Sequence, residues 1–393
     1  MSNFDLIKEA DQAFVANTYG RFPVAVEKGV NATCYDFDGK EYIDFSSGIG
    51  VNSLGFCDKG WIKAVTEQLN TLQHISNLYY TSPCIEAAKL LCERTGMKKV
   101  FFSNSGAESN EGAIKCARKY SFDKYGSGRS KVITLVNSFH GRTVTTLAAT
   151  GQDVFHKYFF PFTDGFEFVP ANDINALKEA LDGTVCALMV ELIQGEGGVM
   201  PLDSDYVKEL EIICKEYDLV LIVDEVQTGV GRTGELFAFQ QYGINPDIVT
   251  TAKGIGGGLP LGCIIFGEKT ENVFGAGDHA TTFGGNPVAT AGAVHILKRL
   301  DSFFLSEVKK KGEYMREKIM SMPHVIGVDG LGLMMGVRLD ESVKSSDVVK
   351  KAIEKGTLLL TAKAKVRLLP PLTITYEEID KGLSAMEKAL SEF

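Results

Sequence analysis

Lys253 is the residue in this sequence best suited to covalent chemistry. It follows an apolar run, Asp247–Thr251, and precedes a glycine-rich loop, Gly254–Pro260. A lysine at a strand end can reach a neighbouring crevice, and the glycines let a ligand approach the backbone. Burial would lower the pKa of the amine toward the reactive free form. The alternative is an ordinary exposed lysine, the commoner fate of this residue type.

A carboxylate, Asp224, ends the most apolar strand pattern of the chain, Leu219–Asp224, and is followed by Glu225 and Gln227. Ligands of open α/β sheets bind at the carboxyl ends of the strands. There Asp224 would keep a pyridine ring protonated and electron-withdrawing, and Gln227 could donate to a ring hydroxyl oxygen. Asp224 could instead cap the segment that follows, because aspartate is a preferred N-cap residue.

Two further strand ends carry polar or flat side chains. The turn after Phe102 offers backbone amides at a helix start, the arrangement that holds a phosphate, through Ser105, Gly106 and Ala107. An ordinary helix start capped by Ser105 is the alternative. After the strand that ends at Val136, Phe139 could stack on a flat ring and Arg142 could bind a carboxylate with two hydrogen bonds. Core packing and a surface ion pair are the alternatives for these two residues.

A lysine that forms a Schiff base, a carboxylate facing a pyridine nitrogen and a phosphate cradle are the parts that aldehyde-cofactor chemistry requires. Alternating apolar runs and helical patterns between residues 99 and 266 predict the α/β sheet that would position them, mostly parallel and buried on both faces. The predicted strands are Lys99–Ser103, Lys131–Val136, Val185–Glu191, Leu219–Asp224, Asp247–Thr251 and Leu261–Phe266. Amphipathic helices are predicted over Ser105–Tyr125 and Tyr206–Tyr217.

The last hundred residues have a different pattern, which indicates a smaller α+β lobe. It comprises a charged helix, Phe303–Met320, a glycine-rich strand pattern, Val325–Leu339, and a closing helix from Tyr376. We therefore expect an N-terminal segment over residues 1–45 that belongs with the small lobe, a large cofactor-binding domain over 46–290 and a small C-terminal domain over 291–393.

Composition excludes several other classes of protein. The 393 residues carry a net charge of −9, which argues against binding to nucleic acid or anionic membranes. The eight cysteines show no Cys-x-x-Cys spacing, as expected for reduced thiols in a cytoplasmic protein. The N-terminus lacks the features of a signal peptide, and no apolar run approaches the length of a membrane-spanning helix. The six histidines show no metal-ligand spacing, so no metal site is expected.

Taken together, the motifs resemble those of the class III, fold type I aminotransferases, over nearly the whole chain. They are Asn17–Arg21, Asp44–Asn52, Ser103–Asn110, Phe139–Arg142, Gln194–Gly198, Asp224–Gly229, Ala252–Gly254, Thr281–Pro287 and Arg367–Pro371. The resemblance implies pyridoxal 5'-phosphate as cofactor, bound to Lys253, with Lys253 also moving the substrate proton. It further implies a homodimer with active sites at the subunit interface. The other cofactor-binding residues that it implies are Ser105, Gly106, Ala107, Phe139, Asp224, Gln227 and, from the second subunit, Thr282.

At the substrate end, the resemblance implies that Arg142 binds the carboxylate distal to the reacting carbon and Arg367 the α-carboxylate of glutamate or 2-oxoglutarate. Glu196 would pair with Arg367 while the amine donor is bound, so that one site serves two unlike substrates. Tyr19 would line the substrate entrance, or would anchor the N-terminal segment. One departure precedes Arg367, where Lys363-Ala364-Lys365 stands in place of the usual glycine and asparagine.

The expected reaction is transfer of the terminal amino group of N2-acetylornithine to 2-oxoglutarate, giving N-acetylglutamate 5-semialdehyde and glutamate in arginine biosynthesis. Ornithine, succinylornithine, 4-aminobutyrate and a lysine-pathway amine are alternative donors, because such enzymes share a catalytic core and vary the pocket walls. The paired Glu196 and Arg367 argue against an aminomutase. A nicotinamide-dependent dehydrogenase fits the α/β pattern, but Leu259 stands where the dinucleotide fingerprint requires its third glycine.

Overall fold

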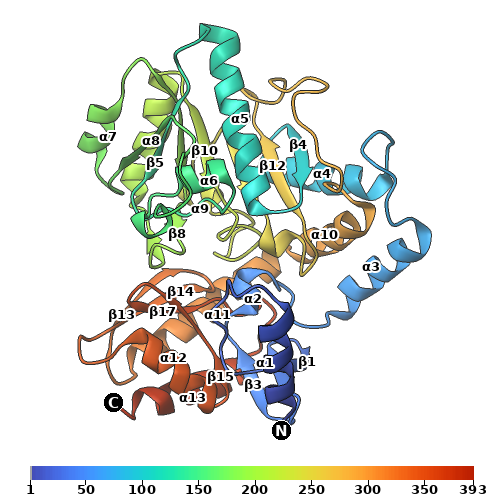
Figure 1. The fold of residues 1–393 in the computed structure, drawn as a ribbon, viewed down its shortest axis with the longest axis vertical. Coiled ribbons are helices and arrows are strands. Elements are labelled where there is room, and N and C mark those ends of the chain that lie inside the picture. Colours follow the sequence, from blue (N-terminus) through green and yellow to red (C-terminus); the bar gives the residue numbers. More distant parts are fainter. Residues whose placement is uncertain (1) are drawn as a thin grey trace.

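The computed structural model describes residues 2–393, so Met1, the first residue of the predicted N-terminal segment, lies outside the described chain. Figure 1 shows an upper part built on a large sheet and a lower part that contains both termini. The large sheet has seven strands in the order β4-β12-β11-β10-β7-β5-β6. Their bounds are Lys99–Ser103 (β4), Gly262–Phe266 (β12), Ile248–Thr251 (β11), Val220–Asp224 (β10), Val185–Val190 (β7), Lys131–Leu135 (β5) and Phe166–Val169 (β6).

Strand direction in this sheet confirms the mostly parallel arrangement that the sequence predicts. β10 pairs in parallel with β7 and β11, and β5 pairs in parallel with β7 and β6. Only β12 runs the other way, antiparallel to both β11 and β4. The carboxyl ends of β4, β5, β7, β10 and β11 therefore meet at one edge of the sheet. The predicted strands are found within a residue of their expected ends, and only the partly exposed edge strand β6 was not predicted.

Helices bury both faces of the sheet. α5 (Gly106–Tyr125) packs on one face, where its Ala113 and Ile114 meet Ala187 and Ile222 of the central strands. α8 (Ser204–Glu216) packs on the other face, where Leu210 and its neighbours join a cluster that contains Leu221. Successive residues of a strand point to opposite faces, so a strand covered on both sides is apolar throughout.

The lower part of Figure 1 combines the beginning and the end of the chain in two four-stranded sheets. β3 pairs in parallel with β15, which places Ile43 opposite Thr357 and ties the N-terminal segment to the C-terminal part. The first sheet contains β1 (Val26–Val30), β2 (Thr33–Asp36), β3 (Glu41–Asp44) and β15 (Thr357–Leu358). The second contains β13 (Val325–Leu331), β14 (Met334–Leu339), β17 (Lys365–Leu368) and β16 (Leu360–Ala362). The helices of this part are α1 (Asn3–Phe14), α2 (Ser47–Gly50), α11 (Ser302–Met320), α12 (Ser345–Glu354) and α13 (Tyr376–Leu390).

The remaining elements connect or flank these layers. α10 packs against both α3 and α4 at the side of the large sheet (Figure 1). The bounds are α3 (Lys59–Thr71), α4 (Ser82–Thr95), α6 (Val144–Ala149), α7 (Ile174–Ala180), α9 (Ala238–Tyr242), α10 (Pro287–Arg299), β8 (Ile193–Gln194), β9 (Met200–Pro201) and the short 3-10 helices η1 (Asp153–Phe155) and η2 (Lys253–Ile255). Among residues 2–393, no helix combines the length and apolar character needed to cross a membrane.

Candidate active site

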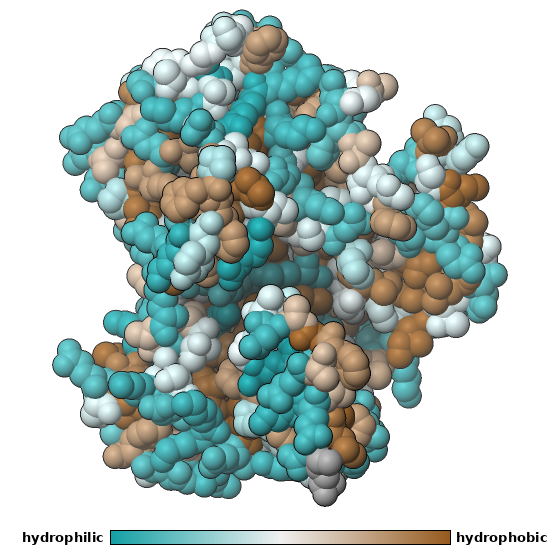
Figure 2. All heavy atoms as spheres, in the orientation of Figure 1, coloured by the Kyte–Doolittle hydropathy of each residue, from teal (hydrophilic) through white to brown (hydrophobic). Residues whose placement is uncertain are grey.

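A cavity of about 430 Å³ opens at the carboxyl edge of the large sheet. Figure 2 shows a recess between the two parts of the molecule on the face that it displays. The segments that follow β4, β5, β7, β10 and β11 all contribute to the lining, which is what the shared strand direction requires. The cavity is large enough for a small cofactor. Among its lining residues are Ser105, Gly106, Ala107, Asn110, Phe139, His140, Arg142, Glu191, Asp224, Val226, Gln227 and Lys253.

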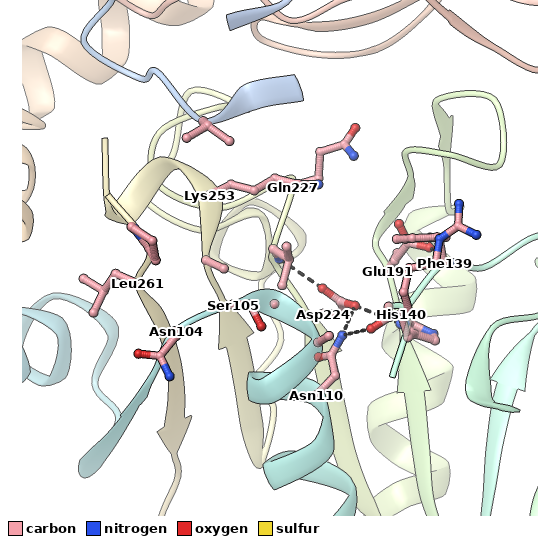
Figure 3. A pocket seen from close by; sticks show the side chains of 18 of the residues that line it. Asn104, Ser105, Asn110, Phe139, His140, Glu191, Asp224, Gln227, Lys253 and Leu261 are labelled. Carbon is pink, nitrogen blue, oxygen red and sulfur yellow. Dashed lines mark hydrogen bonds and ion pairs between the residues drawn. The ribbon is translucent and has the colours of Figure 1, made fainter. Parts of the chain in front are cut away.

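The carboxylate of Asp224 is held at three points. Its Oδ2 accepts a hydrogen bond from Asn110 Nδ2 at 2.8 Å and lies 2.8 Å from His140 Nδ1, and its Oδ1 accepts from the amide of Val226 at 3.0 Å. The side chain is only 4% exposed. Figure 3 shows this group at the base of the cavity, with Lys253 and Gln227 above it. A carboxylate fixed in this way suits a protonated ring nitrogen, and the bond from Val226 shows that it also braces the segment that follows the strand.

Sequence reasoning gave no roles to His140, Asn110 and Glu191. His140 and Asn110 are polar residues inside the quoted motifs, which is the signal that could have identified them, and the structure buries both. The Glu191 carboxylate accepts from the amides of Phe139 at 2.8 Å and Gly195 at 3.2 Å. Burial raises the pKa of Glu191 to about 7, although the nearby His140 acts to lower it. His140 and Asn110 therefore hold Asp224 directly, whereas Glu191 braces the backbone at Phe139 and Gly195.

Lys253 faces the cavity from the start of η2. Its backbone has a φ of 47°, in the left-handed region that a residue with a side chain seldom adopts. Such strain persists only where the surrounding structure holds it, and it is concentrated at functional sites. Burial lowers the pKa of the Lys253 amine, and the negative charge of Glu196 partly opposes that effect. This shift makes the free amine, the form that attacks an aldehyde, easier to reach than in an exposed lysine.

The first turn of α5 has the features of a phosphate cradle. Ser105 is the N-cap, and its Oγ accepts from the amide of Glu108 at 3.2 Å, so the capping alternative is present in the structure. Capping satisfies only one amide of the turn. Gly106 and Ala107 lie where no earlier helical carbonyl exists to accept from their amides, and both line the cavity. The helix start can therefore cap itself and still bind a phosphate.

The carboxylate-binding arginine predicted near the C-terminus is paired within the chain. Arg367 Nη1 lies 2.5 Å from Glu196 Oε1, and Arg367 is only 3% exposed. Gln227 contacts both partners, at 3.4 Å each, and joins the pair to the cavity. Burial disfavours the charge on Glu196, but the charge and hydrogen bond of Arg367 outweigh burial and lower the pKa of this carboxyl. Within the described chain, the buried Nε of Arg367 has no hydrogen-bond partner.

The position of the Gln227 side chain depends on the absence of a side chain at Gly195. A Cβ atom at Gly195 would lie 2.4 Å from Gln227 Oε1. Any side chain there would displace Gln227 from the position where it contacts Glu196 and Arg367. The first glycine of the Gln194–Gly198 motif, Gly195, is therefore explained by packing against Gln227.

Two other predicted residues lie away from this cavity. Tyr19 is 71% exposed and contacts Arg21, whose guanidinium carbon lies 5.3 Å from the ring centroid. Thr282 is an exposed residue that lines a second cavity together with Ser76 and Cys84. A single chain does not bring either side chain to Asp224 or Lys253, so their roles remain predictions.

The unusual lysines before Arg367 lie in a hairpin, Lys363 in its turn and Lys365 at the start of β17. Ala362 pairs with Lys365, which leaves Lys363 and Ala364 as a two-residue connection between β16 and β17. Lys363 has a φ of 52°, a conformation for which asparagine and glycine are the favoured residues in such turns. Its Nζ donates to Asn137 Oδ1, and Lys365 Nζ donates to Asp329 Oδ2 at 2.6 Å. The hairpin therefore keeps its form without the usual residues.

Comparison with known proteins points to one family. The profile of the class-III aminotransferases matches residues 14–390. Acetylornithine aminotransferase of Haemophilus ducreyi is 52% identical over 389 residues, which cover 99% of each chain. Acetylornithine aminotransferase of Methanocaldococcus jannaschii is 43% identical over 390 residues, which cover 98% of each chain.

Solved structures of related enzymes have the same fold. Ornithine aminotransferase from Toxoplasma gondii superposes with a TM-score of 0.94 at 32% identity, covering 100% of this chain and 96% of that one. N-acetylornithine aminotransferase from Stenotrophomonas maltophilia superposes with a TM-score of 0.84 at 34% identity, covering 98% of each chain. A second structure of the Toxoplasma gondii enzyme is described as having partial occupancy of pyridoxal phosphate at its active site.

Proposed function

This chain belongs to the class-III aminotransferases, which depend on pyridoxal phosphate, and on that premise we propose that it moves the terminal amino group of N2-acetylornithine to 2-oxoglutarate. The products would be N-acetylglutamate 5-semialdehyde and glutamate, a step of arginine biosynthesis. The high identity to acetylornithine aminotransferases over the full chain supports this substrate. The geometry of the two arginines supports it independently.

Arg142 and Arg367 differ in whether a carboxylate of the chain already pairs with them. Arg367 is paired with Glu196, whereas Arg142 lines the cavity and has no ion pair or hydrogen bond from its side chain within residues 2–393. The site in this state offers one free carboxylate-binding group. N2-acetylornithine has one carboxylate, far from its reacting amine, and so matches it. Glutamate has two, and the second requires Glu196 to release Arg367.

The cofactor supplies, when bound, an aldehyde that links to amines and a ring that withdraws electrons from the substrate carbon. The Lys253 amine would hold the cofactor and then carry a proton between substrate and cofactor. Asp224, held by His140 and Asn110, would keep the ring nitrogen protonated. Ser105, Gly106 and Ala107 would bind the phosphate, Gln227 the ring hydroxyl oxygen, and Phe139 would pack on the ring.

Ornithine is the second candidate donor. The structural similarity to ornithine aminotransferase favours it, because those two folds differ little. Ornithine carries an additional ammonium group in place of the acetamide. A direct comparison of the two amines therefore distinguishes the two donors.

We also propose a cytoplasmic homodimer. The segment around α3 and α4 exposes large apolar side chains, including Leu78 and Tyr80, which are 87% and 98% exposed. Figure 2 shows apolar residues gathered on the right-hand side, where Figure 1 places α3. Such a surface is typical of an interface, and Thr282 lies next to Asn77 and Leu78 in the second cavity. A second copy seated there would bring Thr282 to a phosphate site.

All eight cysteines are unpaired, which suits a reducing compartment such as the cytoplasm.

The domain boundaries belong to the same proposal. Residues 1–45 would associate with a small domain over 291–393, as the pairing of β3 with β15 favours. Residues 46–290 would form the large cofactor-binding domain around the seven-stranded sheet.

Visible absorption of the purified, cofactor-supplemented protein tests the proposal. The cofactor band should be bleached by N2-acetylornithine in the absence of a keto acid, and more efficiently than by ornithine, succinylornithine or 4-aminobutyrate. Lys253→Ala should show no normal turnover, with Lys215→Ala as the matched exposed control. Faster bleaching by another amine would contradict the substrate, and absence of the band would contradict the role of Lys253.

A further inference from the structure

Arg142 is oriented by aromatic rings. Its guanidinium carbon lies 4.1 Å from the ring centroid of Phe155 and 5.4 Å from that of Phe139. The two rings meet edge to face, with centroids 5.8 Å apart. Phe155 is half-buried at the end of η1 and does not line the cavity, whereas Arg142 and Phe139, which it contacts, do.

Other arginines near aromatic rings are held differently. Arg129 lies 4.2 Å from the Tyr125 ring centroid, but it also donates to the carbonyls of Val185 and Tyr217. Arg118 lies over Phe166 and donates to the carbonyl of Ser130. Those arginines use their N–H groups to fasten segments of the chain together.

A guanidinium that lies over a ring face can keep its hydrogen-bond donors available. Attraction between a cation and the ring face acts perpendicular to the guanidinium plane, whereas its five N–H donors point outward within that plane. A carboxylate partner would hold Arg142 equally well, but it would compete with the carboxylate of a substrate. Phe155 can therefore restrict the motion of the side chain without occupying the atoms that bind substrate.

We propose that Phe155 is a positioning residue that sets the preference of this enzyme for amines with a distal carboxylate. It does so by holding the Arg142 guanidinium at the cavity with its donors free. This inference rests on the proposed function, because it assigns Arg142 to the distal carboxylate of N2-acetylornithine. Ordering a long side chain before binding reduces the conformational entropy lost when the substrate binds.

Two substrates that differ only in this carboxylate measure the effect. N-acetyl-1,4-diaminobutane is N2-acetylornithine without its carboxylate, so the ratio of the two kcat/KM values reports carboxylate recognition alone. Phe155→Leu and Phe155→Met keep an apolar side chain but remove the ring, whereas Phe155→Tyr keeps the ring. Val154→Ala is a matched control, because Val154 is a mostly exposed neighbour in the same short helix. Arg142→Ala gives the reference value of the kcat/KM ratio in the absence of the arginine.

In Phe155→Leu and Phe155→Met, we expect the ratio to fall roughly 3- to 10-fold, mainly through a higher KM for N2-acetylornithine, as expected for loss of one cation–π contact. The ratio should be unchanged in Phe155→Tyr and Val154→Ala, and the cofactor absorption should be unchanged in all four variants. A merely structural role would change both substrates together and leave the ratio constant.

The outcomes separate this inference from the proposed function. A ratio that collapses in Arg142→Ala but is unaffected in both Phe155→Leu and Phe155→Met would overturn the role of Phe155 and leave the proposed function standing. A wild-type enzyme that does not prefer N2-acetylornithine over its decarboxylated analogue would overturn the role of Arg142, and the role of Phe155 with it.

Discussion

The Asp224 end and the Arg142 end of the cavity hold their charged groups in opposite ways. Asp224 is buried and fixed by three hydrogen-bonding partners from separate elements. Arg142 is exposed, and its guanidinium carbon lies over the rings of Phe139 and Phe155. One cavity therefore contains a carboxylate that is fixed, at Asp224, and a guanidinium whose hydrogen-bond donors are free, at Arg142.

This contrast matches the work that each end would perform. Electrostatic stabilisation of a reaction requires groups that are already oriented before charge develops, because their reorganisation would add to the barrier. Recognition of two different substrates requires groups that can be paired and released, as Arg367 is paired with Glu196. We therefore expect substitutions at the inner end to act on kcat and substitutions at the outer end to act on KM and on substrate choice.

The largest expected effect is at the inner end. Asp224→Asn would remove the negative charge that we propose keeps the ring nitrogen protonated, so kcat should fall about 10²- to 10³-fold while KM changes little. Steady-state kinetics measure both quantities. Asp247→Asn is the control, since Asp247 is also a largely buried carboxylate but braces Leu221 and Lys269 away from the cavity. Equal losses of kcat in the two variants would show that burial of a carboxylate, and not its position, explains the effect.

Substitution of Arg142 should give the opposite pattern. Removing a charge-assisted hydrogen-bond donor costs roughly 1.5–3 kcal/mol, so Arg142→Ala should raise the KM for N2-acetylornithine about 10- to 100-fold and leave kcat within a few-fold of the wild type. Arg142→Lys should recover only part of the loss, because lysine lacks the planar fork. A variant that loses kcat at unchanged KM would break the distinction between the two ends.

Glu196→Ala tests the release of Arg367. Without its partner, Arg367 would be free to bind the α-carboxylate of glutamate. The ratio of the single-turnover rate with glutamate to that with N2-acetylornithine should therefore rise roughly tenfold. Gln227 remains in contact with Arg367, which limits the disturbance of the site. Glu209→Ala is a surface control, because Glu209 pairs with Lys178 far from the cavity. An unchanged ratio of the two half-reactions would mean that Glu196 does not gate Arg367.

The smallest expected effect is a shift in the pH at which Lys253 binds the cofactor, on which Glu196 also acts. Because burial lowers the pKa of Lys253, its free amine should form at lower pH than that of an exposed lysine. The rate at which the apoprotein binds cofactor should rise with pH and reach half its maximum below the midpoint measured with Nα-acetyllysine. Glu196 opposes this shift, since its negative charge stabilises the ammonium form. Glu196→Ala should therefore lower the midpoint further, and a midpoint that rises in this variant would contradict the electrostatic role of Glu196.

The amino-acid sequence by itself determined the large sheet and the positions of its polar strand ends. Runs such as Val185–Val190 are apolar at every position because both faces are covered, and this pattern is visible without coordinates. The placement of Lys253 and Asp224 at strand ends followed directly, since parallel strands end at one edge. The edge strand β6 was missed because it is short and partly exposed, so its residues lack that pattern.

The tertiary structure decided which polar groups meet across the chain; the Glu196–Arg367 pair was expected only from the family resemblance, not from the sequence pattern. Asn110 and Asp224 are 114 residues apart, and Glu196 and Arg367 are 171 apart, and no local periodicity encodes such contacts. Their pairing depends on how α5 lies on the sheet and how β17 approaches the loop after β8. The same is true of Phe155 and Arg142, which meet because η1 lies beside the segment that follows β5. A sequence pattern reports the burial that each residue requires, whereas the identity of the partner is set by packing.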